Sequence, residues 1–339
     1  GGLKEVKVYI AAKRKLGVSY EDIDVLFAGD LLNQCISSSF AARGTSIPFL
    51  GLYGACSTMA ESLLLAAAFV DAGFARTAAA LTSSHFASAE RQYRFPLGYG
   101  GQRTPTAQWT VTGSGCCIVG GSGSGVRIEA ATIGRVQDLG IKDANNMGAA
   151  MAPAAIDTLQ AHFRDLRRVP QDYDLIVTGD LGALGKKIVL DQFQRVGVDL
   201  TPVYDDCGVL IYDPKRQDVH AGGSGCGCGA SVLCGYLLDR LEKRELRRLR
   251  ARLDGRAPSS PAAAGEEGAR RWPQAVKSRD IGRTSAEDPH TSAAAWLVKR
   301  RDKPFRTRSI IMETARLMAV KTAGRSGDWS PGLSVRARR

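Results

Sequence analysis

The chain of 339 residues is long enough for two ordinary domains or one large duplicated one, and 44% hydrophobic residues can form a sizeable core. Its net charge of +12 is concentrated after residue 240. No apolar run reaches the roughly 18–20 residues of a membrane span, and no secretory signal is visible. The eight cysteines lack the spacing of a zinc site, which predicts free thiols in a reducing compartment.

The first elements predicted are a helix and a strand. Residues 3–16 have helical apolar spacing without a cap in front, so we expect further N-terminal residues before them. Residues 25–28 (VLFA) are an apolar run followed by Gly29 and Asp30. Such a run is typical of a strand buried on both faces, as in a parallel sheet.

Residues 48–73 predict a short buried strand, a Gly-Ala-Cys corner and a helix that ends at a glycine. The helix is expected to open at Ser57 and Thr58, with a capping box completed by Glu61. Cys56 would then lie at a helix start, where free amides and about half a positive charge lower the pKa of a thiol and attract anions. Cys56 is therefore a candidate reactive cysteine or part of an anion site; the alternative is a buried structural cysteine at a tight turn.

The next stretch is predicted to contain strands and glycine-rich loops. Residues 78–84 suit a strand that ends in hydroxyl groups, followed by His85. Residues 90–94 form a charged strip, which lies on the solvated surface, pairs with a carboxylate or pairs within itself. Further strands are predicted at 108–115, 116–119 and 127–137, and a loop at 145–155.

A phrase of eleven residues occurs twice, 150 positions apart. Residues 21–31 (EDIDVLFAGDL) and 171–181 (QDYDLIVTGDL) agree at five positions. Residues 221–238 repeat the order found around Cys56: a glycine-rich turn, a cysteine and an apolar helix. The repeated phrase and the repeated corner occur in the same order in both parts of the chain, which predicts a duplicated α/β fold.

A set of motifs resembles the stage V sporulation protein AD family, almost continuously from about residue 3 to residue 248. They are GDLLNQ (29–34), GACST (54–58), TSSH…AERQ (82–92), YGGQRTPTA (99–107), TVTGSG (110–115), MAPAAIDT (151–158), DCGVLIY (206–212) and AGGSGCGC (221–228). This family is similar in fold to the thiolases. The resemblance therefore implies two βαβαβ halves in five αβαβα layers, incomplete at both ends, which agrees with the internal repeat.

The resemblance also implies a function in spore-forming bacteria. Such a protein binds dipicolinic acid, with or without calcium, and is needed for its uptake into the developing spore. It is expected to attach peripherally to the spore's inner membrane, with membrane proteins of the same operon as partners, and to form a homodimer as thiolase-like proteins do. No cofactor is expected.

Three parts of the chain follow from the resemblance. Residues 1–140 would be the first thiolase-like half without its first strand, and residues 141–248 the second half without its last strands. Residues 249–339 would be a basic tail, either disordered or translated out of frame. A frameshift is favoured because the second sheet would otherwise lack strands. A nucleic-acid role fits the charge of the tail, but few aromatic residues accompany it, so no nucleic-acid partner is expected.

By resemblance, Cys56 aligns with the nucleophile of thiolases and ketoacyl synthases. Acyl transfer also needs a base and donors for the oxyanion. Condensing enzymes have a histidine just after the strand that here ends at Thr178, where this chain has Gly179 and Asp180. Their second partner comes from the corner at 222–228, which contains no His or Asn. We therefore predict a binding protein and not an enzyme; the alternative is a thiolase-like or ketoacyl-synthase-like acyltransferase using Cys56.

Four further polar residues are assigned structural positions. His162 is expected on a solvated helix face, and His220 in a structural role before the second corner. Asp30 and Asp180 end equivalent strands and are predicted to cap the helices that follow them.

Dipicolinate is a flat dianion with carboxylates on both sides of a pyridine nitrogen. A receptor for it needs two clusters of donors facing each other around an apolar slot. The helix start at Cys56 would supply one cluster, and the glycines of the second corner would let backbone amides supply the other. The predicted ligand-binding residues are Cys56, Ser57, Thr58, Ser83, Ser84, His85, Gly223, Ser224, Gly225 and Cys226.

Overall fold

The computed structural model describes residues 17–246, except 34, 94–99, 123–125 and 144, and three short strands beyond them. The helix predicted at 3–16 and nearly all of the tail predicted from residue 249 onward lie outside the described residues.

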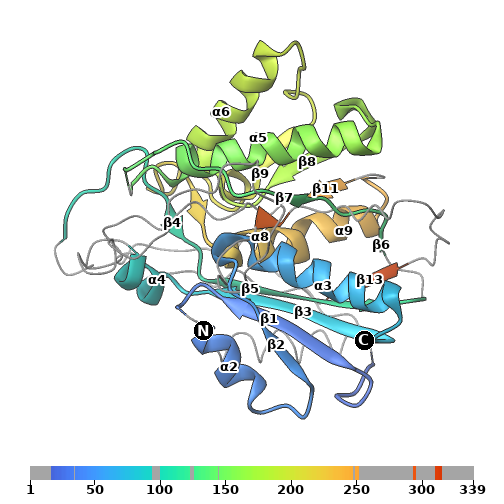
Figure 1. Cartoon of the computed structure of the whole chain (residues 1–339). Coiled ribbons are helices and arrows are strands. Elements are labelled where there is room, and N and C mark those ends of the chain that lie inside the picture. The colour runs from blue at the N-terminus through green and yellow to red at the C-terminus, as the bar shows by residue number, and fades with distance from the viewer. Residues whose placement is uncertain are drawn as a thin grey trace, which may run out of the picture.

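Two β-sheets alternate with three layers of helices (Figure 1). The first sheet has the order β2 (Phe49–Gly51), β1 (Val25–Asp30), β3 (Thr77–Ser84), β5 (Gly113–Gly120), β13 (Ile310–Thr314) and β6 (Val126–Ile128). The second has the order β11 (Leu249–Ala251), β8 (Leu175–Thr178) and β9 (Tyr204–Asp206). Short pairs join β10 (Gly223–Ser224) to β4 (Trp109–Thr110), and β12 (Ala293–Ala294) to β7 (Ile133–Gly134).

The helices cover the outer faces of both sheets and fill the space between them (Figure 1). The middle layer contains α3 (Thr58–Ala72), α8 (Cys226–Val232), the π-turn η4 (Leu233–Leu237) and α9 (Leu238–Glu242). The outer layers contain α2 (Ile36–Ala42) on one side, and α5 (Met147–Leu166) and α6 (Gly182–Arg195) on the other. The remaining short elements are η1 (Ala55–Ser57), α4 (Phe86–Tyr93), η3 (Pro170–Asp172) and α7 (Cys207–Leu210).

The central strands of the first sheet are buried on both faces, as predicted. In β1, Val25 and Phe27 pack in the cluster around α3 and α8, whereas Leu26 and Ala28 pack in the cluster on the α2 side. Successive side chains of a strand point to opposite faces, so one apolar run can serve two layers. The same alternation gives Ala78, Ala80, Cys117 and Val119 on the inner face, and Ala79, Leu81, Cys116 and Ile118 on the outer face.

The repeated phrase forms equivalent units in the two sheets. Its first copy contains β1, which pairs in parallel with β2 and precedes α2; its second copy contains β8, which pairs in parallel with β9 and precedes α6. Parallel neighbours need a crossover connection, and a helix supplies it in each copy. The predicted duplicated α/β fold is confirmed.

Several predicted boundaries were wrong. The short strand before Cys56 was expected to be buried, but β2 lies at a sheet edge and its Leu50 is 45% exposed. The strands predicted at 108–115 and 116–119 are the short β4 and the continuous β5, and the strand predicted at 127–137 is broken into β6 and β7. The loop predicted at 145–155 is mostly helix: α5 begins at Met147, with Asn146 as its N-cap accepting a bond from the Ala149 amide.

One helix of the described part is long and apolar enough to cross a membrane by length and composition, over Ala55–Ala72. The sequence analysis predicted no apolar run of membrane-spanning length. Half of this segment is buried, and α3 lies between the two sheets (Figure 1). Its apolar character therefore suits the middle layer of the fold. The helix ends at Gly73, as predicted, with φ +79° in the left-handed region that glycine tolerates.

Candidate functional site

Cys56 lies in the tight turn η1, immediately before α3. The turn holds Ala55 at φ 51°, a left-handed conformation that is uncommon for a residue with a side chain. The predicted capping box does not form: the hydroxyl of Ser57 donates backward to the Gly54 carbonyl, and that of Thr58 to the Ala55 carbonyl, each at 2.8 Å. These bonds fix the turn and leave the Cys56 side chain half-buried at the helix start.

The second glycine-rich corner meets the end of β3 beside this turn. The Cys226 thiol donates to the Ser83 carbonyl at 3.1 Å, and the Gly227 amide donates to the Ser84 hydroxyl at 3.0 Å. Cys226 also packs with Cys56 in one small apolar cluster. We call this meeting point the corner cluster, which comprises Cys56, Ser57, Thr58, Ser83, Ser84, Gly223, Ser224, Gly225 and Cys226.

The hydroxyls of the corner cluster mostly bond within the protein. Ser57, Thr58, Ser83 and Ser84 are all buried. The Ser84 hydroxyl donates to the Val111 carbonyl at 2.6 Å while it accepts the Gly227 amide. The Ser84 side chain therefore joins the two halves of the chain, and the predicted role of these four side chains as ligand donors stays a prediction.

Asp180 shapes the second corner. Its carboxylate accepts the Gly225 amide at 2.6 Å, and Gly225 has φ +96°, which favours glycine. The buried amide of Gln108 donates to the carbonyls of Asp180 and Gly223, both at 2.7 Å. Asp180 therefore fixes the corner instead of capping α6, so that prediction was wrong. Asp30, by contrast, accepts the Ser38 amide in the first turn of α2 at 2.8 Å, as predicted.

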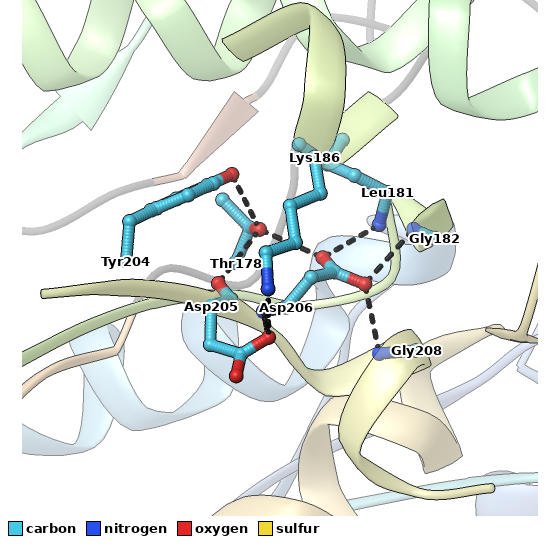
Figure 2. A network of polar contacts seen from close by, with 8 residues as sticks. All are labelled: Thr178, Leu181, Gly182, Lys186, Tyr204, Asp205, Asp206 and Gly208. Atoms are coloured by element: carbon cyan, nitrogen blue, oxygen red, sulfur yellow. Dashed lines mark hydrogen bonds and ion pairs between the residues drawn. The ribbon is translucent and has the colours of Figure 1, made fainter. Parts of the chain in front are cut away.

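A different residue, Asp206, accepts the hydrogen bonds of the amides at the start of α6 (Figure 2). Its buried carboxylate accepts the amides of Leu181, Gly182 and Gly208 at 2.8–2.9 Å and the Thr178 hydroxyl at 2.7 Å. A negative charge at a helix N-terminus is favoured by the free amides and by the helix dipole. The sequence analysis missed this role, although Asp206 is the last residue of β9, just as Asp30 is the last residue of β1.

Two buried groups behind the corner cluster, the Cys228 thiol and the Tyr212 hydroxyl, have carboxylates nearby. Burial, and the nearby Cys207, Asp180, Asp206 and Cys56, raise the pKa of Cys228 well above its ordinary value. Burial, with Cys228 and Glu90, likewise raises the pKa of Tyr212 to about 12. Both shifts favour the neutral form, whereas a thiolate nucleophile needs a positive environment.

The histidines are placed differently from some predictions. His162 was expected to be solvated, but it is buried, with its ring nitrogens 2.8 Å from the Thr132 hydroxyl and 2.7 Å from the Tyr173 hydroxyl. His220 lies 3.1 Å from an Asp218 carboxylate oxygen. His85, predicted to join the Cys56 site, lines a separate cavity.

Glu90 does not belong to a solvated strip. It is fully buried, and Arg103 donates to its carboxylate at 2.9 Å. The amide and hydroxyl of Thr110 also donate to Glu90, while the guanidinium of Arg103 lies 4.1 Å from the centre of the Trp109 ring. This buried pair therefore holds β4, and β4 pairs with the second corner through Trp109 and Gly223.

A cavity of about 670 Å³ lies on the outer side of α4. We call it the α4 cavity; it is lined by Leu32, His85, Ala87, Ser88, Arg91 and Gln92.

Cys56 should be the thiol that reacts in the folded protein. All eight cysteines lie in the described part, and seven of them are buried, whereas Cys56 is half-buried. We expect a thiol reagent such as dithionitrobenzoate to modify about one thiol in native protein and eight in denaturant. Cys56→Ser should reduce the native value to near zero. Rapid modification of several thiols before unfolding would contradict this assignment.

Comparison with known proteins tests the resemblance. The stage V sporulation protein AD family matches over residues 5–262. The chain belongs to the stage V sporulation protein AD family. The protein of that name from Bacillus subtilis (strain 168) is 50% identical to it over 238 residues, which cover 70% of each chain.

Solved structures show the fold of this family member. It is similar to 3-oxoacyl-(acyl carrier protein) synthase III from Pseudomonas aeruginosa, with 12% identity, a TM-score of 0.51, and coverage of 89% of this chain and 84% of that one. It is also similar to OleA from Xanthomonas campestris, in a structure with bound lauric acid and lauroyl-CoA, with 12% identity, a TM-score of 0.51 and coverage of 87% and 82%. The thiolase-like fold is confirmed; identities this low carry the fold alone.

Proposed function

We propose that the protein binds dipicolinic acid at the corner cluster and serves its uptake into the developing spore. The observation that carries the proposal is the meeting of two glycine-rich corners, one from each half, beside Cys56. Backbone amides near glycines are suited to carboxylates, and each half contributes one glycine-rich corner to this meeting point. Membership in a sporulation protein family supports a role in spores.

We propose binding without catalysis. A thiolate nucleophile needs a neighbouring base or a positive charge. The position after β8 that carries a histidine in condensing enzymes has Asp180, which is engaged with Gly225. Burial raises the pKa of the neighbouring Cys228, and Cys207 and the carboxylates of Asp180 and Asp206 raise it further. An acyltransferase that uses Cys56 is the competing function, supported by the position of Cys56 in a thiolase-like fold.

Calcium is proposed to accompany the ligand. Asp180 and Asp206 are buried near the corner cluster, and the repulsion between their charges and a dianion falls if a cation arrives with it. Within the described residues, no group of three acidic, cysteine or histidine side chains is placed to hold a metal. The cation would therefore be held chiefly by the ligand's own carboxylates.

Partners and location belong to the same proposal. We propose peripheral attachment to the spore's inner membrane, membrane proteins of the same operon as partners, and a homodimer. Exposed apolar side chains beside the edge strand β2, at Ile36, Phe40 and Leu50, support an interface with a second copy there.

Cys56 variants test the binding site. We expect Cys56→Leu to weaken dipicolinate binding at least tenfold, because a branched side chain with two more heavy atoms fills the space at the helix start. Cys56→Ser should bind within about threefold of the unaltered protein. Calorimetry with and without calcium measures both, and calcium should tighten binding.

Either of two results would contradict non-catalytic dipicolinate binding at the corner cluster. One is unchanged dipicolinate affinity in Cys56→Leu. The other is turnover of a thioester by the unaltered protein that Cys56→Ser abolishes; that result would favour the acyltransferase.

A further inference from the structure

The two faces of α4 contact different parts of the protein. Ala89 and Tyr93, four residues apart, pack with Cys56 in the apolar cluster of the corner. His85, Ser88 and the residues at 91–92 recur three to four positions apart and line the α4 cavity instead. One helix therefore separates the corner cluster from a second hollow, whose lining does not include Cys56.

The lining of the α4 cavity combines positive charge with hydrogen-bond donors. Arg91 is exposed and forms no ion pair with any residue of the described part. The side-chain oxygen of Gln92 accepts the Asn33 amide at 3.1 Å, which leaves the N–H groups of Gln92 to donate elsewhere. His85 is the second titratable side chain of the lining.

Among the residues that the structure describes, no carboxylate lines this cavity. The acidic residue of α4 is Glu90, which points inward and is neutralised by Arg103. The net charge of the lining is therefore positive. A guanidinium presents a planar fork of donors that matches a carboxylate in geometry.

We infer that the α4 cavity is a binding site for a small carboxylate anion, separate from the corner cluster. Arg91 supplies the charge, the side-chain amide of Gln92 supplies further donors, and His85 lines the same cavity. Leu32 and Ala87 provide apolar contact for the body of the anion, so an aromatic or short aliphatic carboxylate fits better than an inorganic anion. This site does not depend on whether the corner cluster binds dipicolinate.

Calorimetry with benzoate as the probe tests the site on the whole chain. We expect Arg91→Gln to lower benzoate affinity about tenfold, the effect of one lost charge-assisted contact. Arg195→Gln is the matched control: it removes one exposed arginine on α6, far along the chain from this cavity, and should change the affinity less than twofold. Raising the salt concentration should weaken binding, because an open site is screened.

A chemical readout adds a second test. Benzoate should protect Arg91, but not Arg195, from modification by phenylglyoxal, as followed by mass spectrometry. Equal benzoate affinity in Arg91→Gln and the unaltered protein would overturn the inference, as would no detectable binding by the unaltered protein. Cys56→Leu separates the two sites, since it should lose dipicolinate binding and retain Arg91-dependent benzoate binding.

Discussion

Replacement of Arg103 by methionine is expected to lower the free energy of unfolding by about 3 kcal/mol, because it strands the fully buried Glu90 carboxylate without its cation. The change also removes a bond to the Gln108 carbonyl and the stacking of the guanidinium on Trp109. Urea unfolding, followed by circular dichroism, measures the loss.

The double variant Glu90→Gln with Arg103→Met separates charge from packing. It keeps an acceptor for Thr110 but has no buried charge, so at least half of the lost stability should return. A loss below 0.5 kcal/mol in Arg103→Met would show that Glu90 finds water or another partner, and that the pair does not hold β4.

The second large effect is expected at Gly227, in the first turn of α8. Alanine ordinarily favours a helix over glycine by about 1 kcal/mol. Here a Cβ atom would lie 2.3 Å from the Ser84 hydroxyl and 2.6 Å from the Gly113 carbonyl. We expect Gly227→Ala to destabilise the protein by about 3 kcal/mol, because neither the strand backbone nor the hydroxyl can withdraw without breaking bonds between the halves.

Gly101→Ala serves as the control for Gly227→Ala. A Cβ atom at Gly101 meets no atom within 4 Å, so this variant should remain within about 0.5 kcal/mol of the unaltered protein. Chemical denaturation gives both values. A stable Gly227→Ala variant would mean that α8 can move away from β3, contrary to the close contacts of Cys226 and Gly227 with Ser83 and Ser84.

Strands with strong apolar runs could be predicted well from the sequence, and the small-residue start of α5 could not. The apolar run at 25–28 predicted a strand buried on both faces, and β1 packs against one cluster on each face of the sheet. The stretch at 145–155 resembled a loop because it is rich in glycine and alanine. Its small residues instead allow close helix packing, since a Cβ at Gly148 would lie 2.4 Å from the Leu181 carbonyl and 3.0 Å from the Gly185 amide. Local composition does not reveal such contacts between distant segments.

The candidate site shows the same division. The two corners could be predicted because each combines a glycine-rich turn with a following helix. The partners of Glu90 could not, since Arg103 and Thr110 are 13 and 20 positions away and a charged strip gives no sign of burial. His85 was grouped with Cys56 because it follows Ser84 directly, yet the strand ends there and the chain turns toward the other face of α4.

The contact between the two halves, at Ser83, Ser84, Cys226 and Gly227, limits how a ligand can enter and leave. One hydroxyl, that of Ser84, bonds to both Val111 and Gly227, and Cys226 bonds to the strand beside it. Parting the halves would break the Ser84–Gly227 and Cys226–Ser83 bonds together in a buried setting, where each unmet group costs about 1–3 kcal/mol. We therefore expect a ligand to enter and leave by local movement of surface segments. The two halves should keep the same relative position in the free and the ligand-bound protein.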